Sequence, residues 1–472
     1  MTELAVVGAG IAGLAAARRF TERAPAGTVV HVFEARDRAG GAIRSEQMGG
    51  AVLEAGPDSL LTRKPAAIEL CRALGLEGEL IGPAPSAHGA DIYWNGRLHP
   101  IPPGLTAGIP SRPEALWRSG LLSWGAKLRA LADLWRPPLP TEPDISLGRL
   151  LEYRFGPQVV DRLVAPLLAG IYAGDIRALS LKATFPQLAA WQAASRSLIR
   201  AARRQPPPPA GRRGPPFLTL RSGLERLVQA LVANTAATWH FAEPVRQVSP
   251  EGDRFRVETD RGRYAVDGVV LAAPAPRTGQ MLAETIPDAA RVLAEIPYTD
   301  LAVVGLLFRA GTVRPPRDKT GVLVPGGQGL AMTAVTYVAS KWAYPEGLAY
   351  EPIRVFFGRA GQESVLDQDD TTLVERALAE LGRILGIRAD PDDARVFRHP
   401  LGMPQYRVGH LERVARLEKA LASWPRLALA GQAYHGVGIP DSIVDGQRAA
   451  DAVLAALGTS ALAAVHEGGA RP

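Results

Sequence analysis

Three glycines near the N-terminus have the spacing that lets a backbone bind a pyrophosphate. The segment VVGAGIAGL at residues 6 to 14 contains Gly8, Gly10 and Gly13, with Ile11 and Ala12 between them. An apolar strand that turns through such glycines into a helix brings backbone N–H groups and the positive helix end close to phosphate oxygens. This spacing therefore predicts a dinucleotide-binding turn.

An acidic residue follows the next apolar strand. The strand TVVHVF ends just before Glu34, which lies roughly twenty residues beyond the glycines, as in dinucleotide-binding folds. A carboxylate at this place accepts hydrogen bonds from the ribose of an adenine nucleotide. Strand, turn, helix, strand and acid therefore agree, while NAD and FAD both stay open at this step.

The residues after Glu34 favour FAD. In ARDRAGGAIRS, which begins at Ala35, Gly40 and Gly41 permit a second close approach of the backbone. Arg44 in the same segment would supply a cation beside a phosphate group or the flavin. We therefore expect FAD as the cofactor.

A second glycine-rich segment, LAGQAYHGVGIPDSI at residues 429 to 443, can close the other side of the cofactor. Gly431, Gly436 and Gly438 allow the backbone to approach a ligand, and a helix that begins near Asp441 would direct its positive end toward it. His435 in this segment is a candidate acid or base, with a position that has no chemical role as the alternative.

Several segments resemble those of known flavoproteins. Residues 34 to 45 resemble the second half of the adenine-dinucleotide motif in the flavin-containing amine oxidase superfamily. Five longer segments resemble the oxygen-dependent porphyrinogen oxidases of haem biosynthesis, in their bacterial coproporphyrinogen III oxidase form: GPDSLLTRKP (56–65), PLLAGIYAGDIRALSLKATFPQL (166–188), FLTLRSGLERLVQAL (217–231), MPQYRVGHLERV (403–414) and YHGVGIPDSI (434–443). The likeness runs along most of the chain.

The resemblance implies further residues that contact FAD. They are Gly56, Pro57, Asp58, Ser59, Val245, His399, Val437, Gly438 and Ile439. Among them the backbone around Val245 is implied to meet the adenine. His399 departs from the aromatic residue that the resemblance implies before MPQY.

The resemblance also implies where the substrate binds. An apolar slot opposite the flavin would be lined by Leu167, Leu168, Gly170, Ile171 and Tyr172, for which a simple core helix is the alternative. Arg63 and Lys64 are the candidates for pairing with propionate groups, and a solvated surface charge is the alternative for both.

The activity that the resemblance implies is oxidation of a porphyrinogen to a porphyrin with O2 as acceptor. Coproporphyrinogen III is the preferred substrate and protoporphyrinogen IX the close alternative. An amine or carotenoid oxidoreductase of the same superfamily comes next, and a non-catalytic binding protein like the GDP-dissociation inhibitors represents another class. A ferrochelatase is a candidate partner enzyme, and no residue pattern selects an oligomeric state.

Composition and spacing argue against other kinds of site. The 472 residues include 54 Lys and Arg against 47 Asp and Glu, a formal net charge of +7, but no nucleic-acid-binding module accompanies this surplus. The histidines show no HxxxH spacing and there is no CxxC pair, so we expect no metal site. Cys71 is the single cysteine, and the amphipathic segment IELCRALGL predicts that it is buried in a helix.

Three kinds of element must position these residues. We expect an α/β fold class: a Rossmann-like FAD-binding domain with a β-sheet substrate domain and an inserted helical domain. The expected boundaries are 1–85, 217–290 and 423–460 for the FAD domain, 86–99 and 291–422 for the substrate domain, 100–205 for the helical domain and 203–216 for a Pro/Arg-rich loop.

We expect no membrane-spanning segment. Residues 320–340 carry no charge, but the prolines and glycines at their centre predict a β-hairpin. The N-terminus starts with a core strand, which predicts no signal or transit sequence and a cytoplasmic location. Trp117, Trp124 and Trp135 are expected to pack within the helical domain, with contact to a membrane surface as the alternative.

Overall fold

The computed structural model describes residues 1–468 except 107–108, 111–112, 206–213 and 345–347, so most of the expected Pro/Arg-rich loop lies outside the described residues. One sheet is five-stranded and parallel throughout, in the order β12-β2-β1-β16-β22. Its strands are β1 (Glu3–Val7), β2 (Val29–Phe33), β12 (Thr238–His240), β16 (Gly268–Leu271) and β22 (Leu427–Leu429). We call it the cofactor sheet.

Two layers cover the cofactor sheet, because a parallel sheet must bury both of its faces. One layer contains α1 (Ile11–Arg23), α2 (Ala66–Ala73), α11 (Glu225–Ala233) and α17 (Ile439–Gly468). The other contains β13 (Val245–Glu251), β14 (Arg254–Thr259), β15 (Arg263–Val266), α12 (Ala275–Leu282), α13 (Pro287–Ala294) and α16 (His410–Leu421). Leu4 and Val6 of β1 pack with the first layer, whereas Ala5 and Val7 pack with the second.

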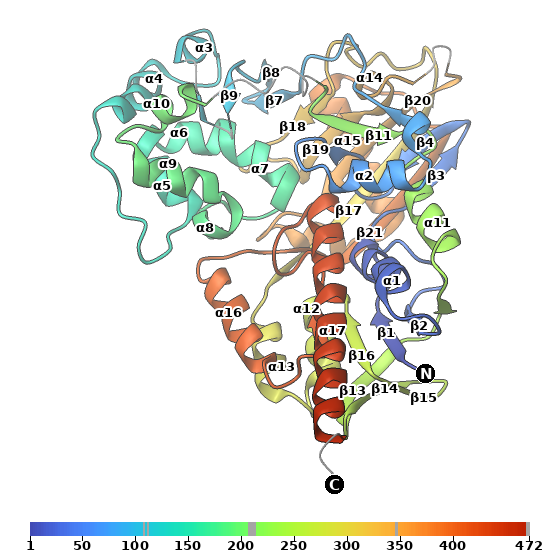
Figure 1. Ribbon diagram of the computed structural model, residues 1–472. Coiled ribbons are helices and arrows are strands. Elements are labelled where there is room, and N and C mark those ends of the chain that lie inside the picture. Colours follow the sequence, from blue (N-terminus) through green and yellow to red (C-terminus); the bar gives the residue numbers. More distant parts are fainter. Residues whose placement is uncertain (107–108, 111–112, 206–213, 345–347, 469–472) are drawn as a thin grey trace.

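Helices α1 and α17 lie side by side on the sheet (Figure 1). A Cβ atom on Gly446 of α17 would lie only 2.0 Å from the Ala12 carbonyl oxygen, so glycine permits this contact. The N-terminal end of α17 is thereby held beside the N-terminal end of α1. A dinucleotide bound there would lie near the N-termini of both helices.

A second sheet has seven strands in the order β21-β17-β20-β19-β18-β7-β8. Its elements are β7 (Asp91–Trp94), β8 (Arg97–Pro100), β17 (Tyr298–Arg309), β18 (Gly321–Leu323), β19 (Met332–Tyr337), β20 (Tyr350–Phe357) and β21 (Asp393–Pro404), with α14 (Val338–Lys341), η5 (Glu363–Asp367) and α15 (Asp370–Leu385). The antiparallel pair β18–β19 confirms the expected hairpin. Leu373, Ala377 and Leu381 of α15 pack on one face of this sheet.

A helical layer stands to one side of both sheets (Figure 1). It contains α3 (Pro113–Trp117), α4 (Trp124–Leu131), η2 (Ala132–Leu134), α5 (Leu147–Phe155), α6 (Pro157–Val159), η3 (Val160–Val164), α7 (Ala165–Tyr172), α8 (Leu181–Thr184), α9 (Pro186–Ala194) and α10 (Leu198–Arg203). Inside it, the fully buried Arg154 and Asp133 form an ion pair at 3.3 Å. The expectation that the tryptophans pack is wrong for Trp124 and Trp135, which are 67% and 76% exposed.

Short elements complete the described chain. They are β3 (Ser45–Met48), β4 (Ala51–Glu54), β5 (Leu60–Leu61), η1 (Glu77–Glu79), β6 (Leu80–Ile81), β9 (Leu105–Thr106), β10 (Ile109–Pro110) and β11 (Phe217–Leu220). Cys71 is buried on α2 as expected, and burial raises the pKa of its thiol to about 11. In the part of the chain that the structure describes, no helix combines the length and the apolar character that crossing a bilayer requires. Parallel cofactor sheet, second sheet and helical layer together confirm the expected α/β fold class.

Candidate functional site

The N-terminal glycine turn connects β1 to α1 with almost no space around its backbone. The Gly8 N–H donates to the Phe33 carbonyl oxygen at 2.7 Å, and a Cβ atom on Gly13 would lie 1.8 Å from the Gly8 carbonyl oxygen. Gly10 differs, because a Cβ atom built there meets no described atom within 4 Å. Gly10 is also the N-cap of α1, and no described side chain caps that end. The turn thus leaves an open space in front of a helix N-terminus, which suits an anion.

Glu34 lies beside this turn at the end of β2. Its Oε2 atom accepts the Ala9 N–H at 2.8 Å and its Oε1 atom accepts the Arg36 N–H at 3.0 Å. Two backbone donors therefore fix the orientation of the carboxylate. Ala35, which follows it, is exposed. A carboxylate held in this way, one strand from the glycine turn, can accept hydrogen bonds from the hydroxyl groups of a ribose.

The segment with Gly40 and Gly41 folds directly against the first turn. The Gly40 N–H donates to the Ala9 carbonyl oxygen at 2.8 Å, and a Cβ atom on Gly41 would lie 3.3 Å from the Gly10 Cα atom. The Gly41 carbonyl oxygen accepts hydrogen bonds from the guanidinium groups of Arg36 and Arg38, at 3.1 and 2.9 Å. These two arginines were not singled out as site residues, although both stand in the segment ARDRAGG.

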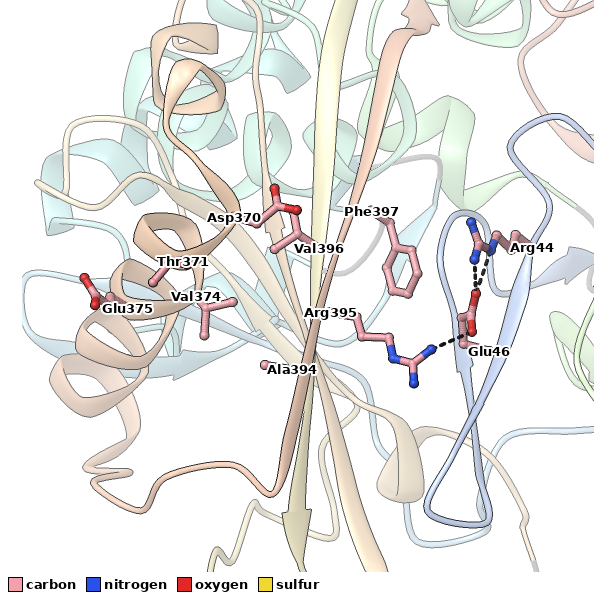
Figure 2. A pocket seen from close by; sticks show the side chains of 10 residues that line it. All are labelled: Arg44, Glu46, Asp370, Thr371, Val374, Glu375, Ala394, Arg395, Val396 and Phe397. Atoms are coloured by element: carbon pink, nitrogen blue, oxygen red, sulfur yellow. Dashed lines mark hydrogen bonds and ion pairs between the residues drawn. The ribbon is translucent and has the colours of Figure 1, made fainter. Parts of the chain in front are cut away.

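Arg44 lies among charged side chains at the edge of the second sheet. It lines an open hollow of about 550 Å³ between β3, β21 and α15, where it and Arg395 both pair with Glu46 (Figure 2). The Arg44 guanidinium carbon also lies 5.8 Å from the ring centre of Phe397. Glu46 neutralises part of its charge, whereas Arg36 and Arg38 contact the second glycine turn directly through the Gly41 carbonyl oxygen.

The C-terminal glycine segment forms a loop at the start of α17. The Gly431 N–H donates to the buried Asp445 carboxylate at 2.8 Å, and a Cβ atom on Gly431 would meet no described atom within 4 Å. Asp445 also binds the His435 Nδ1 atom at 2.8 Å, and these contacts help to hold its pKa below the usual value. His435 is therefore tied to the loop scaffold. We call residues 431–438 the glycine loop, and Val437, Gly438 and Ile439 lie at its junction with α17.

Two cationic side chains, one from the second sheet and one from helix α14, anchor the segment from Gly56 to Ser59. Lys341 of α14 and the buried Arg354 of β20 contact the Asp58 carboxylate at 2.7 and 2.8 Å, and the same Arg354 donates to the Gly56 carbonyl oxygen. Despite burial, these charges hold the pKa of Asp58 below its usual value. No local spacing could have identified either cation, because both lie more than 280 positions along the chain from Asp58.

His399 also reaches this segment, from strand β21. Its Nε2 atom lies 2.8 Å from the Ala55 carbonyl oxygen, and its ring lies 3.7 Å from a Cβ atom built on Gly56. Burial lowers the pKa of His399, and the positive charges of Arg36, Arg354 and Arg38 add to that effect. A neutral imidazole that donates to a backbone carbonyl thus stands where the family's aromatic residue was expected.

Glu54, next to this segment, is a buried carboxyl group whose pKa lies near neutral pH. Burial raises its pKa to about 7, while hydrogen bonds from the Leu224 N–H and the Ser45 hydroxyl oppose the shift. Because the pKa in the folded state lies above that in the unfolded state, the carboxyl group favours folding at low pH and this contribution is lost as pH rises through 7. A shift of this size corresponds to at most about 3 kcal/mol.

We therefore expect the melting temperature of Glu54→Gln to rise relative to that of the wild type as pH increases from 5 to 8. At pH 8 it should approach or exceed the wild-type melting temperature. The amide cannot ionise, so it avoids the cost of a buried negative charge. Differential scanning fluorimetry of both proteins across this range measures the difference. Glu77→Gln, on the exposed η1 segment, controls for the change in net charge. A constant difference between the Glu54→Gln protein and the wild type would contradict the buried titration.

Helix α7 presents the expected substrate residues on two opposite faces. Leu168 and Tyr172 are buried, and the Tyr172 hydroxyl lies 3.3 Å from the Thr184 carbonyl oxygen. Burial raises the pKa of Tyr172 to about 12. Leu167, Gly170 and Ile171 lie on the other face, where Ile171 is 47% exposed and a Cβ atom on Gly170 would meet no described atom within 4 Å. Leu168 belongs to the helical core, against which the half-buried Leu167 also packs, and Tyr172 is buried at the end of the helix.

The two basic candidates and Val245 also have definite places. Lys64 Nζ binds both carboxylate oxygens of Asp441, at 2.6 and 2.7 Å, and so links the GPDS segment to the start of α17. Arg63 is exposed beside it. Val245 is buried at the start of β13, and the loop before it pairs with the Glu34 segment through the Glu243 N–H.

The arrangement brings together most of the residues expected around a dinucleotide. Glycine turns, Glu34, the GPDS segment and the glycine loop all converge on the ends of α1 and α17. Among the described residues no group of three or more His, Cys, Asp or Glu side chains could hold a metal ion. The groups that meet at these helix ends are backbone N–H groups, small residues and cationic side chains. Such a set suits the binding of a large anionic cofactor.

Comparison with known proteins identifies the family. The model of the flavin-containing amine oxidoreductases matches residues 11–454. Coproporphyrinogen III oxidase of Bacillus subtilis (strain 168) is 35% identical over 462 residues, covering 95% of this chain and 97% of that protein. Protoporphyrinogen oxidase of Bos taurus is 30% identical over 488 residues, covering 95% and 98%.

A solved structure agrees with these relatives. A crystal structure from Exiguobacterium sp. 255-15, whose protein is provisionally named a protoporphyrinogen oxidase, superimposes on this chain with a TM-score of 0.86. The two sequences are 32% identical, and the match covers 96% of this chain and 98% of the other. These matches confirm the resemblance seen in the sequence and a flavin as the cofactor class. The chain therefore belongs to the flavin-containing amine oxidoreductase family.

Proposed function

We propose that this protein is an FAD-dependent oxidase that converts a porphyrinogen into the corresponding porphyrin with O2 as acceptor, in haem biosynthesis. Coproporphyrinogen III is the preferred substrate. The observation that carries this proposal is that a coproporphyrinogen III oxidase matches 95% of the chain and is itself covered over 97% of its length. A relative that spans all the elements around the site supports a shared reaction better than a shared fold alone.

FAD is the form of flavin that the described residues fit. The open space in front of Gly10 and the helix end of α1 would take the pyrophosphate, and Glu34 would hold the adenosine ribose. The glycine loop and the segment from Gly56 to Ser59 would lie along the rest of the cofactor. When bound, FAD supplies the redox chemistry, since it accepts hydride equivalents from carbon and returns the electrons to O2.

The chain's own part in the reaction is to bind and orient a large macrocycle. The accessible face of α7, with Leu167, Gly170 and Ile171, supplies an apolar wall in which a glycine leaves room for a ring system. Arg63 and Lys64 supply positive charge for propionate groups at the edge. No acid, base or metal of the chain is needed if the cofactor performs the oxidation.

Lys64→Ala is expected to raise the KM for coproporphyrinogen III about tenfold, the cost of one charge-assisted hydrogen bond at an exposed site. The FAD content should be unchanged. Steady-state fluorescence assays of porphyrin formation measure the change, and Lys419→Ala on α16 is the matched surface control. An unchanged KM together with loss of FAD would instead assign Lys64 to holding Asp441 at the start of α17.

The test of the function is anaerobic bleaching of the bound flavin by reduced porphyrinogens. Rapid bleaching by coproporphyrinogen III, and slower bleaching by protoporphyrinogen IX, is the expected result. The reverse order would make the protein a protoporphyrinogen oxidase, the name carried by the bovine relative. If neither compound bleaches a flavin that is present, the proposal fails and an amine or carotenoid substrate takes its place. A protein that binds no flavin would fit the GDP-dissociation-inhibitor alternative.

The cellular setting belongs to the same proposal. We propose a cytoplasmic protein whose porphyrin product passes to a ferrochelatase. The exposed Trp124, Leu128 and Trp135 of the helical layer make this face the candidate for contact with a membrane surface.

A further inference from the structure

Residues 405–410, here called the connecting segment, join the end of helix α7 to the glycine loop. The segment belongs to the motif MPQYRVGHLERV, to which no role has so far been assigned. On the α7 side, the buried Gln405 donates through Nε2 to the Tyr172 carbonyl oxygen at 2.8 Å. A Cβ atom on Gly174 would lie 2.2 Å from the Gln405 side-chain oxygen, so the contact leaves no space.

Backbone hydrogen bonds extend the same contact beyond α7. The Ser180 N–H donates to the Tyr406 carbonyl oxygen at 2.7 Å, and the Val408 N–H donates to the Ala178 carbonyl oxygen at 3.0 Å. Residues 405–408 therefore pair with residues 178–180, which follow α7, in the manner of a short β-strand pair. Their position relative to the accessible face of α7 is fixed.

Tyr406 makes the contact on the other side. Its hydroxyl donates to the Gln432 carbonyl oxygen at 2.7 Å and accepts the Gly436 N–H at 2.8 Å. Both partners belong to the glycine loop, so one hydroxyl group ties two of its backbone positions. The side chain is 1% exposed, which gives water no access to compete for these bonds.

His410 supports the tyrosine from the start of α16. Its ring stacks on the Tyr406 ring with centres 3.8 Å apart and planes inclined by 12°, and its Nε2 atom lies 3.1 Å from the Tyr434 carbonyl oxygen. Burial lowers the pKa of His410 to about 4, so the ring is neutral at neutral pH and can donate from Nε2. A third backbone position of the glycine loop is thereby held.

The glycine loop contains two glycines in backbone conformations that other residues rarely adopt. Gly431 and Gly436 adopt φ angles of +128° and +151°, and a Cβ atom on Gly431 would point into open space. Asp445 contacts Gly431 and His435, Gln432 donates to the Gly402 carbonyl oxygen, and Asp441 accepts the Gly438 N–H. Beside these contacts, Tyr406 and His410 hold three further backbone positions of the loop. The connecting segment is thus the link between this loop and the substrate wall.

We propose that Tyr406 is a positioning residue, whose hydroxyl sets the glycine loop at a fixed distance from the accessible face of α7. The inference rests on the proposed function, in which the flavin lies against that loop and the macrocycle against α7. A displacement of about 1 Å between reacting groups is enough to slow an enzymatic reaction by roughly a hundredfold, so losing the two loop contacts of this hydroxyl group is expected to lower the reaction rate.

The test compares Tyr406→Phe with Tyr298→Phe. Phenylalanine keeps the stack on His410 and loses both hydrogen bonds to the loop. The control loses a similar bond, because the Tyr298 hydroxyl accepts the Ala275 N–H at 3.0 Å outside the loop. We expect both variants to fold and to bind FAD. Only Tyr406→Phe should change the visible circular dichroism of the bound flavin and release FAD about tenfold faster, as expected for the loss of one to two neutral hydrogen bonds.

The reaction itself gives a second readout. In anaerobic stopped-flow experiments, Tyr406→Phe should lower the limiting rate of flavin reduction by about tenfold or more, with the apparent Kd of the porphyrinogen changed less than about threefold. Wild-type values for the reduction rate, the release rate and the flavin spectrum would overturn the inference. Equal effects of the two variants would also overturn it, because they would reflect a general loss of stability.

A second variant covers the case in which Tyr406→Phe does not fold. Gln405→Met keeps the length of the side chain but loses the bond to Tyr172, and should give the same slow reduction. If porphyrinogens fail to reduce the wild-type flavin, the proposed function fails. The flavin spectrum and the FAD release rate still decide the role of Tyr406 in that case, since neither requires a substrate.

Discussion

Gly10→Val is expected to give a folded protein that is purified without its flavin. The reason is that Gly10 has an ordinary extended backbone and open space at its Cβ position, so valine strains nothing in the chain itself. The space that valine would fill is the one proposed for the pyrophosphate. Loss of two charge-assisted hydrogen bonds to that group would weaken FAD binding by roughly 10²- to 10⁴-fold.

Two further variants show whether this loss is local. Gly125→Val on α4 also places a side chain where no described atom lies within 4 Å, and should retain FAD fully. Gly13→Ala should fail in a different way, because its Cβ atom would lie 1.8 Å from the Gly8 carbonyl oxygen and the turn could not form. Absorbance at the flavin band, together with circular dichroism in the far ultraviolet, separates the two outcomes. Full FAD occupancy in Gly10→Val would remove the pyrophosphate from this turn.

Gly170→Leu is expected to abolish most porphyrinogen oxidation while leaving FAD bound. Gly170 lies on the accessible face of α7, and a leucine side chain would extend into the space proposed for the macrocycle. A large flat substrate cannot move aside without leaving the flavin, so kcat/KM should fall by about a hundredfold or more. Leucine is a better helix former than glycine, so the melting temperature should stay the same or rise.

Measuring activity and stability together separates a blocked substrate site from a general loss of folding. Gly125→Leu, at the exposed helical glycine of α4, should change neither kcat/KM nor FAD content. Anaerobic bleaching by coproporphyrinogen III, measured with matched flavin concentrations, is the assay. Normal bleaching by Gly170→Leu would show that the accessible face of α7 is not the substrate wall.

Those residues that could be placed from the sequence share a local cause. Gly8, Gly10 and Gly13 lie within one turn, and Glu34 follows at the end of the adjacent strand. The strand, turn and helix that position them are consecutive in the chain, so their spacing alone defines the geometry. Cys71 and the hairpin of β18 and β19 could be predicted for the same reason.

Other residues could be named without being oriented. The helical period separates Leu168 and Tyr172 from Leu167, Gly170 and Ile171, but both faces of α7 are apolar. Which face packs depends on the neighbouring helices, and the structure buries the first pair. Arg44 shows the same effect, since its pairing with Glu46 in the hollow also involves Arg395, which lies 349 positions from Glu46.

The amino-acid sequence by itself thus determined the glycine turn, the class of fold and the family, because these depend on short-range spacing and on motifs within single segments. Only the tertiary structure decided that Arg354 and Lys341 anchor Asp58, that His399 reaches the Ala55 carbonyl, and that Tyr406 joins α7 to the glycine loop. Each of these contacts pairs residues from different sheets or layers. Their formation depends on how the two sheets and the helical layer pack, and no spacing along the chain encodes that arrangement.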